Sequence, residues 1–318
     1  MAEIRPNRAV LAADRRLAVR LRRLLVTDWE YLLIVAPVVA FYVVFAYVPM
    51  WGAIIAFKDF GFGDTIGSAP WVGLRWFKEF FESFYFWRLI RNTALINVLS
   101  LVLGFPAPIV FALVVNELRI RWFKRSLQTV SYMPHFISTV VVVGMMYNFL
   151  GVTHGWVNNL FDHLGMERIN FFLESRYFRF LYVSSGVWQT FGWSSIIFIA
   201  TMSSIDAEQY EAAVIDGASR TRQMRHITIP GIMPTIVIIL IFTIGNMMNV
   251  GFEKIILMYS PGIYEVADVI QSYVYRRGLI DFDYSFSAAV GLFNSVINLA
   301  LLVGANYLAR RVGETSLW

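Results

Sequence analysis

The sequence predicts an all-α integral membrane protein with six transmembrane helices. Of its 318 residues, 58% are apolar and only 15% are charged, whereas soluble domains contain roughly 45–50% apolar and about 25% charged residues. The chain also has six long apolar stretches, and its strongest basic cluster lies directly before the first of them. This composition excludes a disordered chain and an ordinary soluble enzyme, and a bilayer is the environment that suits such an apolar surplus.

The six apolar stretches have about the length of membrane spans, since a helix crosses the hydrocarbon core in about 20 residues. The predicted spans are residues 31–57, 93–116, 126–150, 181–203, 231–250 and 285–309. The first contains no charged residue and is far longer than the apolar core of a signal peptide, so we expect an uncleaved helix. The apolar part of the third begins only at Phe136, and its helix is therefore expected to start near Ser126.

Basic residues predict the orientation of these spans, because Lys and Arg collect in the short cytoplasmic connections of membrane proteins. With the N-terminus inside, 16 of the 27 Lys and Arg residues fall in inside segments. We therefore expect both termini in the cytoplasm, with a basic N-terminal arm over residues 1–30 and a tail over residues 310–318. The net charge of +5 reflects membrane topology in this interpretation, and no nucleic acid is expected as a partner.

The longest cytoplasmic connection, residues 206–230, has helix signals of its own. Asp206 is a good N-cap, and Gly217 can adopt the left-handed conformation that ends a helix. A second helix is expected from about Ser219, with Pro230 stopping it where the chain returns to the membrane. The prediction is a helix–glycine–helix elbow outside the bilayer, and a loop of this length with internal structure is usually functional.

Aromatic residues crowd the outer segment 58–92, which contains three Trp between residues 71 and 87. Amphipathic rings collect at the headgroup level of membranes, so an interfacial belt is the first interpretation. Stacking on a sugar, or docking of an extracytoplasmic partner, is the alternative.

The residues that most catalytic and metal sites require are missing. There is no Cys, the four His are scattered, and none of the four Lys follows Gly, which excludes the common phosphate-binding loop. We therefore expect no enzyme activity, no metal and no cofactor in this chain. One alternative is a membrane-bound glycosyltransferase that uses Asp281 and Asp283 as a D-x-D pair. Another, a stand-alone secondary sugar carrier, is weakened because the spans have essentially no charge in their middles for ion coupling.

Neutral polar and aromatic side chains interrupt the apolar spans. Amides are costly to expose to lipid, so they should face a neighbouring helix or a solute. The spacing of three between Asn246 and Asn249, and of four between Asn294 and Asn298, predicts that each pair shares a helical face. Hydrogen bonding between helices is the alternative to a solute pathway, and uncharged donors with aromatic rings suit a hydroxylated solute better than an ion. The candidate pathway residues are Asn97, Trp188, Gln189, Trp193, Asn246, Asn249, Asn294 and Asn298.

The cytoplasmic elbow also contains a family motif. It reads Glu211-Ala212-Ala213, then Gly217 after three residues, then Ile227-Thr228-Ile229-Pro230 after nine more. This resembles the E-A-A-x3-G-x9-I-x-L-P motif of ABC importer permeases, with Ile229 in place of Leu as the one departure. Four further stretches resemble the polysaccharide-type branch of the carbohydrate permeases, which is similar in fold to the maltose permeases. These stretches are Gly104–Pro108, Ser131–Phe136, Ile244–Phe252 and Ser316–Trp318.

The resemblance implies a type I importer permease in the bacterial inner membrane, with the elbow as its coupling loop. By this likeness the residues that couple to a separate ATPase are Glu211, Ala212, Ala213, Gly217, Ile227 and Pro230. The implied partners are a second, homologous permease chain, a dimer of ATPase subunits that binds ATP and Mg²⁺, an extracytoplasmic solute-binding protein and the lipid bilayer. The implied solute is an oligo- or polysaccharide of the alginate type.

Overall fold

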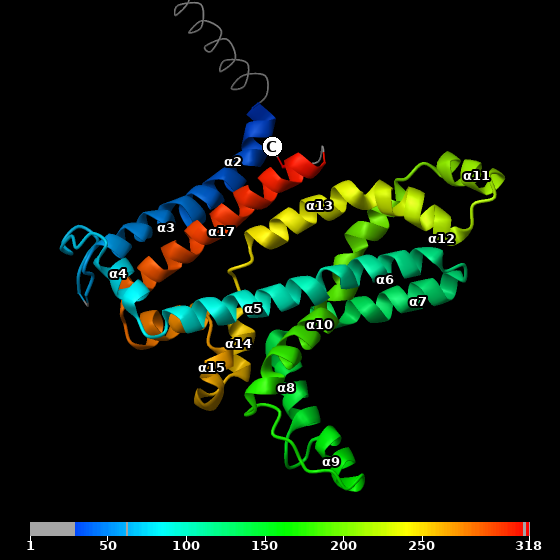
Figure 1. The fold of residues 1–318 in the computed structure, drawn as a ribbon. Coiled ribbons are helices and arrows are strands. Elements are labelled where there is room, and N and C mark those ends of the chain that lie inside the picture. Colours follow the sequence, from blue (N-terminus) through cyan, green and yellow to red (C-terminus); the bar gives the residue numbers. More distant parts are fainter. Residues whose placement is uncertain (1–28, 62, 314–315, 318) are drawn as a thin grey trace, which may run out of the picture.

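The computed structural model describes residues 29–61, 63–313 and 316–317, and this part of the chain is built from helices (Figure 1). Its only β-type pairing is a single antiparallel bridge between Lys58 and Trp71. Four helices are long and apolar enough to cross a membrane: Trp29–Phe57, Phe86–Glu117, Arg220–Gly245 and Tyr284–Arg311. The all-α membrane fold is therefore confirmed. The predicted N-terminal arm lies almost wholly outside the described residues.

The first long helix shows most of its apolar side chains at the surface. It consists of α2 (Trp29–Tyr42), a π-helical turn (Val43–Tyr47), α3 (Val48–Met50) and a 3₁₀ segment (Trp51–Phe57). The 3₁₀ segment packs on α17 (Tyr284–Val312), which runs beside this helix in Figure 1. A helix that is apolar all round and little covered by protein is typical of a chain in contact with lipid.

The second long helix combines α5 (Phe86–Gly104) and α6 (Pro106–Glu117), and the short α4 (Arg75–Glu82) precedes it. Pro106 occupies the first position of α6, where a missing N–H costs little.

The aromatic segment around α4 is partly a packed core and not simply an interfacial belt. Trp76 and Phe80 are buried, and Phe80 packs edge-to-face on Phe293 of α17 with ring centroids 5.5 Å apart. Phe84 and Trp87 remain exposed.

The predicted third span, 126–150, is not one straight helix. The chain bends by 100° in the middle of it. Pro134 has no N–H to continue the first helix, and the Ser138 hydroxyl accepts the Val141 N–H at 3.4 Å and starts a new one. The prediction of a continuous helix was wrong because it extended the apolar stretch backwards through Pro134 into the polar helix before it. The segment consists of α7 (Arg121–Tyr132), a 3₁₀ turn (Met133–Phe136) and α8 (Thr139–Leu150).

The centre of the fold is α10 (Ser175–Ser203), which follows the short α9 (Trp156–His163) and contains the predicted fourth span. It packs against α5, α6, α7 and the later helix α13 (Ile229–Gly245). Gly192 permits the crossing with α7, because a Cβ at this position would lie 2.0 Å from the backbone oxygen of Ser131.

The elbow consists of α11 (Ala207–Ile215), α12 (Arg220–Gln223) and a π-helical turn (Met224–Thr228), which leads directly into α13. The prediction that Pro230 stops the second helix was wrong. The Ile229 N–H bonds to the Met224 oxygen five residues back, and this wider turn accommodates the missing N–H of Pro230. The fifth span ends at Gly245, earlier than predicted.

The segment between α13 and α17 is held by a buried carboxylate. Asp268 is fully buried, its two oxygens each accept a 2.7 Å bond from Arg276, and Arg88 of α5 approaches at 3.2 Å. These pairs fix the segment to the start of α5. It comprises α14 (Phe252–Met258), a 3₁₀ turn (Pro261–Ile263), α15 (Tyr264–Ala267), α16 (Ile270–Tyr275) and a π-helical turn (Arg276–Ile280).

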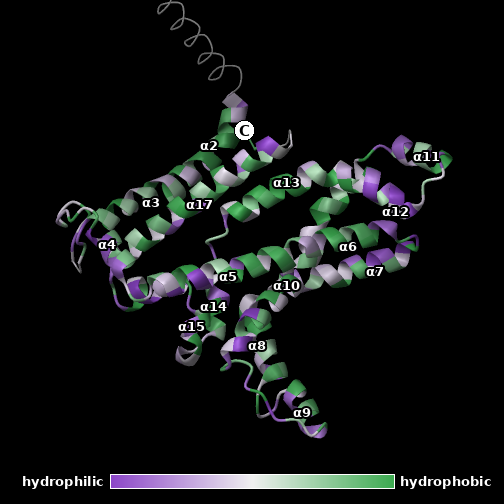
Figure 2. Cartoon of the chain, in the orientation of Figure 1, coloured by the Kyte–Doolittle hydropathy of each residue, from purple (hydrophilic) through white to green (hydrophobic). Residues whose placement is uncertain are grey.

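Hydropathy follows this architecture. In Figure 2 the long helices α2, α13 and α17 are mostly hydrophobic, whereas α12 is strongly hydrophilic. Figure 1 places α11 and α12 at the end of α13 that lies away from α14 and α15. The elbow therefore projects from one end of the apolar bundle.

Candidate functional site

The first helix of the elbow is defined by its two ends. The Asp206 carboxylate accepts the Glu208 N–H at 3.0 Å, and Gly217 has a φ of 71°. The Ala218 N–H bonds to the Ala213 oxygen at 2.8 Å, which completes the usual glycine-terminated helix end. The predicted cap and the predicted glycine turn are both confirmed.

The outer face of α11 is open. None of its residues is buried, and its last two side chains, Val214 and Ile215, are 62% and 86% exposed. Within the described part of the chain, Glu211 has neither an ion pair nor a side-chain hydrogen bond, and Ala212 beside it is also exposed. The exposed face of this short helix therefore has two small residues, a carboxylate without a partner among the described residues, and an apolar end. Such a face contributes little to a core and is suited to docking.

Two side-chain contacts connect the elbow to the bundle. The Tyr210 hydroxyl of α11 lies 2.9 Å from the Thr228 hydroxyl at the base of α13. Arg220 of α12 bonds at 3.3 Å to the carboxylate of Glu117, at the end of α6. These bonds connect α11 to the residue directly before α13, and α12 to the end of α6.

The remaining motif residues lie where the elbow joins α13. Ile227 is half-buried in the π-helical turn, and Pro230 is exposed at the start of α13. The structure therefore brings the six predicted coupling residues into one elbow and its junction with the bundle.

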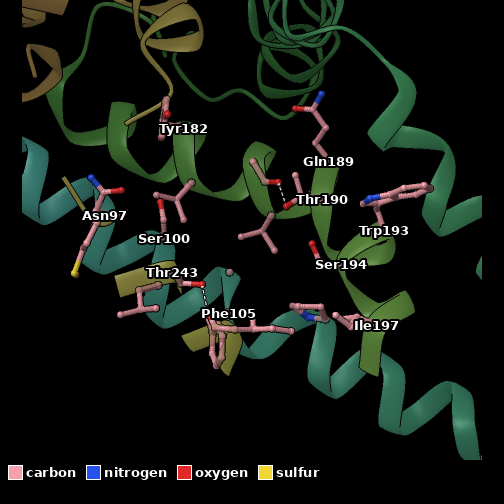
Figure 3. Close-up of a pocket in the computed structure, with 18 of the residues that line it drawn as sticks. Asn97, Ser100, Phe105, Tyr182, Gln189, Thr190, Trp193, Ser194, Ile197 and Thr243 are labelled. Carbon is pink, nitrogen blue, oxygen red and sulfur yellow. Dashed lines mark hydrogen bonds between the residues drawn. The ribbon is translucent and has the colours of Figure 1, made fainter. Parts of the chain in front are cut away.

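A cavity of about 810 Å³ lies between α5, α10, α13 and α14. Figure 3 shows Asn97 and Ser100 of α5 on one side of it, and Gln189, Thr190 and Trp193 of α10 on the other. Hydroxyl and amide groups on an otherwise apolar wall are typical of a site for a polar, hydrogen-bonding solute. The polar residues that line it are Asn97, Ser100, Tyr182, Gln189, Thr190, Ser194, Thr243 and Lys254.

Three of the predicted pathway residues line this cavity. The Asn97 amide donates to the Thr93 oxygen at 2.9 Å, and the Gln189 amide donates to the Ile137 oxygen at 2.7 Å. Trp193 stacks on His135 with ring centroids 4.7 Å apart and planes 3° from parallel. Gln189 thus satisfies a carbonyl left open by the break between α7 and α8.

The other predicted pathway residues do not line this cavity. Trp188 is exposed on another face of α10. Asn246 and Asn249 lie beyond the end of α13, so they do not share a helical face, but their side chains do meet, since the Asn249 amide donates to the Asn246 side-chain oxygen at 3.4 Å.

Two of these amides, Asn294 and Asn298 of α17, instead bond to the irregular chain that follows α13. The Asn294 amide donates to the Asn249 oxygen at 2.8 Å, and the Asn298 oxygen accepts the Met248 N–H at 2.9 Å. Backbone that leaves a helix loses its regular hydrogen bonds, and side-chain partners such as these replace them. Asn294 and Asn298 of α17 therefore bond to neighbouring protein, as in the alternative raised by the sequence, but their partners lie in irregular chain and not in a helix.

Sequence reasoning missed most of the polar residues in the cavity wall. Gly186, Thr190 and Ser194 recur every fourth residue of α10, as do Gln189 and Trp193. This spacing marks one helical face and could have revealed them. Lys254 had no comparable signal, because α14 follows an irregular stretch.

The D-x-D pair does not resemble a metal site. Asp283 caps α17 by accepting the Phe286 N–H at 3.3 Å, and it pairs with Arg277 at 2.7 Å. No group of three or more candidate ligands that could hold a metal ion occurs among the described residues.

Known proteins resemble this chain over most of its length. Residues 104–314 match the family model of the binding-protein-dependent transport system inner membrane component. Protein LplB of Bacillus subtilis (strain 168) is 42% identical over 290 residues, which is 91% of each chain. The polygalacturonan/rhamnogalacturonan transport system permease protein YteP of the same organism is 42% identical over 297 residues, covering 93% of this chain and 92% of the relative.

Solved structures agree in fold. A chain of a bacterial ABC transporter involved in the import of the acidic polysaccharide alginate superposes with a TM-score of 0.85 and 39% identity, covering 93% of this chain and 99% of that one. A bacterial alginate ABC transporter in complex with an alginate pentasaccharide-bound periplasmic protein gives a TM-score of 0.86 and 38% identity, covering 94% and 100%. The chain therefore belongs to the family of binding-protein-dependent transport system inner membrane components and is a non-enzymatic permease subunit of an ABC importer.

Proposed function

We propose that this chain forms one half of the membrane pathway of a saccharide importer, and that its elbow couples the pathway to a separate ATPase. The observation that carries the coupling is the state of α11, which is exposed on its outer face and connected to the bundle through Tyr210. Glu211 would pair with a basic group of the ATPase, and the small Ala212 would permit close approach.

The proposed solute is an oligo- or polysaccharide of the alginate type. Two relatives support it: one is a permease for polygalacturonan and rhamnogalacturonan, and one belongs to an importer of alginate. The cavity offers amides, hydroxyls and the Trp193 ring, and these groups suit sugar hydroxyls and the apolar faces of sugar rings.

The proposed assembly contains a second, homologous permease chain, so that the solute passes between the two subunits. A dimer of ATPase subunits would bind both coupling loops, and an extracytoplasmic binding protein would deliver the solute. A solved relative in complex with a saccharide-bound periplasmic protein supports the last partner. ATP and Mg²⁺ would be bound by the ATPase chains and not by this one.

The proposed orientation places the elbow and both termini in the cytoplasm of a bacterial cell. The basic residues of the elbow support it, since Arg220, Arg222 and Arg225 precede the fifth span on one side of the membrane. In the proposed cycle, ATP binding closes the ATPase dimer and moves both elbows. Through α13 and α6 this motion turns the cavity from inward-facing to outward-facing.

The test uses the complete importer reconstituted in vesicles, with saccharide uptake and ATP hydrolysis measured together. Glu211→Gln should lower solute-stimulated ATP hydrolysis and uptake by about tenfold, as expected for the loss of one charged contact at an interface. Glu208→Gln, on the same exposed helix, is the matched control and should leave both rates unchanged. If Glu211→Gln and Glu208→Gln give the same rates, Glu211 has no specific role in the coupling. Uptake that continues without ATP would favour a stand-alone carrier.

A further inference from the structure

The wall of the cavity contains a buried charged side chain to which the proposed function assigns no role. Lys254 of α14 lines the cavity wall and is only 7% exposed. Its ammonium group donates to the Tyr182 backbone oxygen at 2.9 Å and lies 4.9 Å from the centre of the Tyr182 ring. Both contacts come from α10, so the charge lies at the contact between α14 and the wall of the cavity.

No carboxylate balances this charge. Among the described residues Lys254 has no ion pair, and no Asp or Glu lines the cavity. A buried ammonium without an acidic partner is expensive, and Lys has three N–H donors of which the structure gives one a protein acceptor. The site is therefore suited to binding an anion that comes from outside the described chain.

We infer that Lys254 binds a carboxylate of the solute in this cavity and selects acidic saccharides over neutral ones. This inference rests on the proposed function, which assigns the cavity to a saccharide. The amide of Asn97 and the hydroxyls of Thr190 and Ser194 would bind the sugar hydroxyls, and Lys254 would form a stronger bond to a carboxylate than to the hydroxyl of a neutral sugar.

The protonation of Lys254 makes the selectivity depend on pH. Burial lowers the pKa of Lys254 to about 8, and no nearby charge contributes to this shift. The phenols of the packed elements include Tyr147 of α8, Tyr182 of α10, and Tyr273 and Tyr275 of α16, and among the described contacts only Tyr182 lies against the Lys254 ammonium. Below pH 8 the ammonium is charged and attracts a carboxylate, and above pH 8 this attraction is lost.

The test measures direct binding to the purified importer complex by titration calorimetry, without the binding protein. The two probes are a galacturonic acid tetrasaccharide and a galactose tetrasaccharide of the same linkage, which differ only in their carboxylates. At pH 7 the acidic probe should bind about tenfold more tightly, as expected for one charge-assisted hydrogen bond. Raising the pH to 9 should reduce this preference to about twofold, because most Lys254 side chains are then neutral, while leaving the neutral probe unaffected.

Variants of Lys254 test whether this side chain causes the preference. Lys254→Gln and Lys254→Met should bind both probes equally, whereas Lys254→Arg should keep the preference. If a variant does not fold, the pH series on the unaltered complex decides alone. An undiminished preference for the acidic probe at pH 9, or in Lys254→Gln, overturns the inference. Equal binding of both probes to the unaltered complex overturns the inference and leaves the proposed function standing, whereas binding of neither overturns both.

Discussion

The carboxylate of Asp268 illustrates how much a single buried charge determines in this protein. It is fully buried and receives Arg276 at 2.7 Å and Arg88 at 3.2 Å. Asp268→Asn would leave both guanidinium groups without their anion, so the free energy of unfolding should fall by about 3–5 kcal/mol. Thermal unfolding of the purified protein in detergent measures this change.

A matched exposed pair provides the control for that prediction. Asp162 pairs with Arg168 at 3.1 Å, but its side chain is 58% exposed. Asp162→Asn should therefore cost at most about 1 kcal/mol. Equal losses of stability in the two variants would contradict the assigned role of Asp268.

Individual polar residues were only partly predictable. Of the side chains singled out within the apolar spans, Asn97, Gln189 and Trp193 line the cavity. Asn249 does not, because α13 ends at Gly245 and the next residues are irregular, which the sequence does not show. Whether an amide faces a solute or an open backbone carbonyl depends on tertiary contacts that spacing alone does not contain.

At the scale of elements, the contact between Tyr210 and Thr228 is the direct brace between α11 and α13. Tyr210→Phe and Thr228→Val each remove one hydroxyl of this 2.9 Å bond. Each should lower the number of solute molecules imported per ATP by about twofold to tenfold, in line with the loss of one hydrogen bond. Uptake and ATP hydrolysis in the same reconstituted vesicles give this ratio.

The double variant sharpens this prediction. If the two hydroxyls act through one bond, the double variant should be no worse than either single one. Thr221→Val, on the exposed face of α12, serves as the control and should keep the native ratio. Additive losses would show that the two hydroxyls act independently.

Elements whose signals are local were predicted well. The cap at Asp206 and the glycine turn at Gly217 depend on neighbouring residues, and both are present. The helix through Pro230 and the 100° bend before Thr139 were missed. In the first case a π-helical turn accommodates the proline, and in the second Pro134 and Ser138 separate a polar helix from the apolar helix that follows it.

At the scale of the whole molecule, the proposed function requires that the elbow lie in the cytoplasm and touch a separate ATPase. The chain contains no Cys, so one introduced thiol is its only thiol. Glu211→Cys tests the elbow, and Phe84→Cys, at a position 89% exposed in the outer segment, is the matched control.

The most direct measurement is cross-linking of the Glu211→Cys importer with a maleimide–amine reagent in inside-out membrane vesicles. The account predicts a covalent adduct between this chain and the ATPase subunit for Glu211→Cys and none for Phe84→Cys. It also predicts that a membrane-impermeant maleimide added to intact spheroplasts labels only Phe84→Cys. Labelling of Glu211→Cys from the outside, or the absence of any adduct in the assembled complex, would contradict the account.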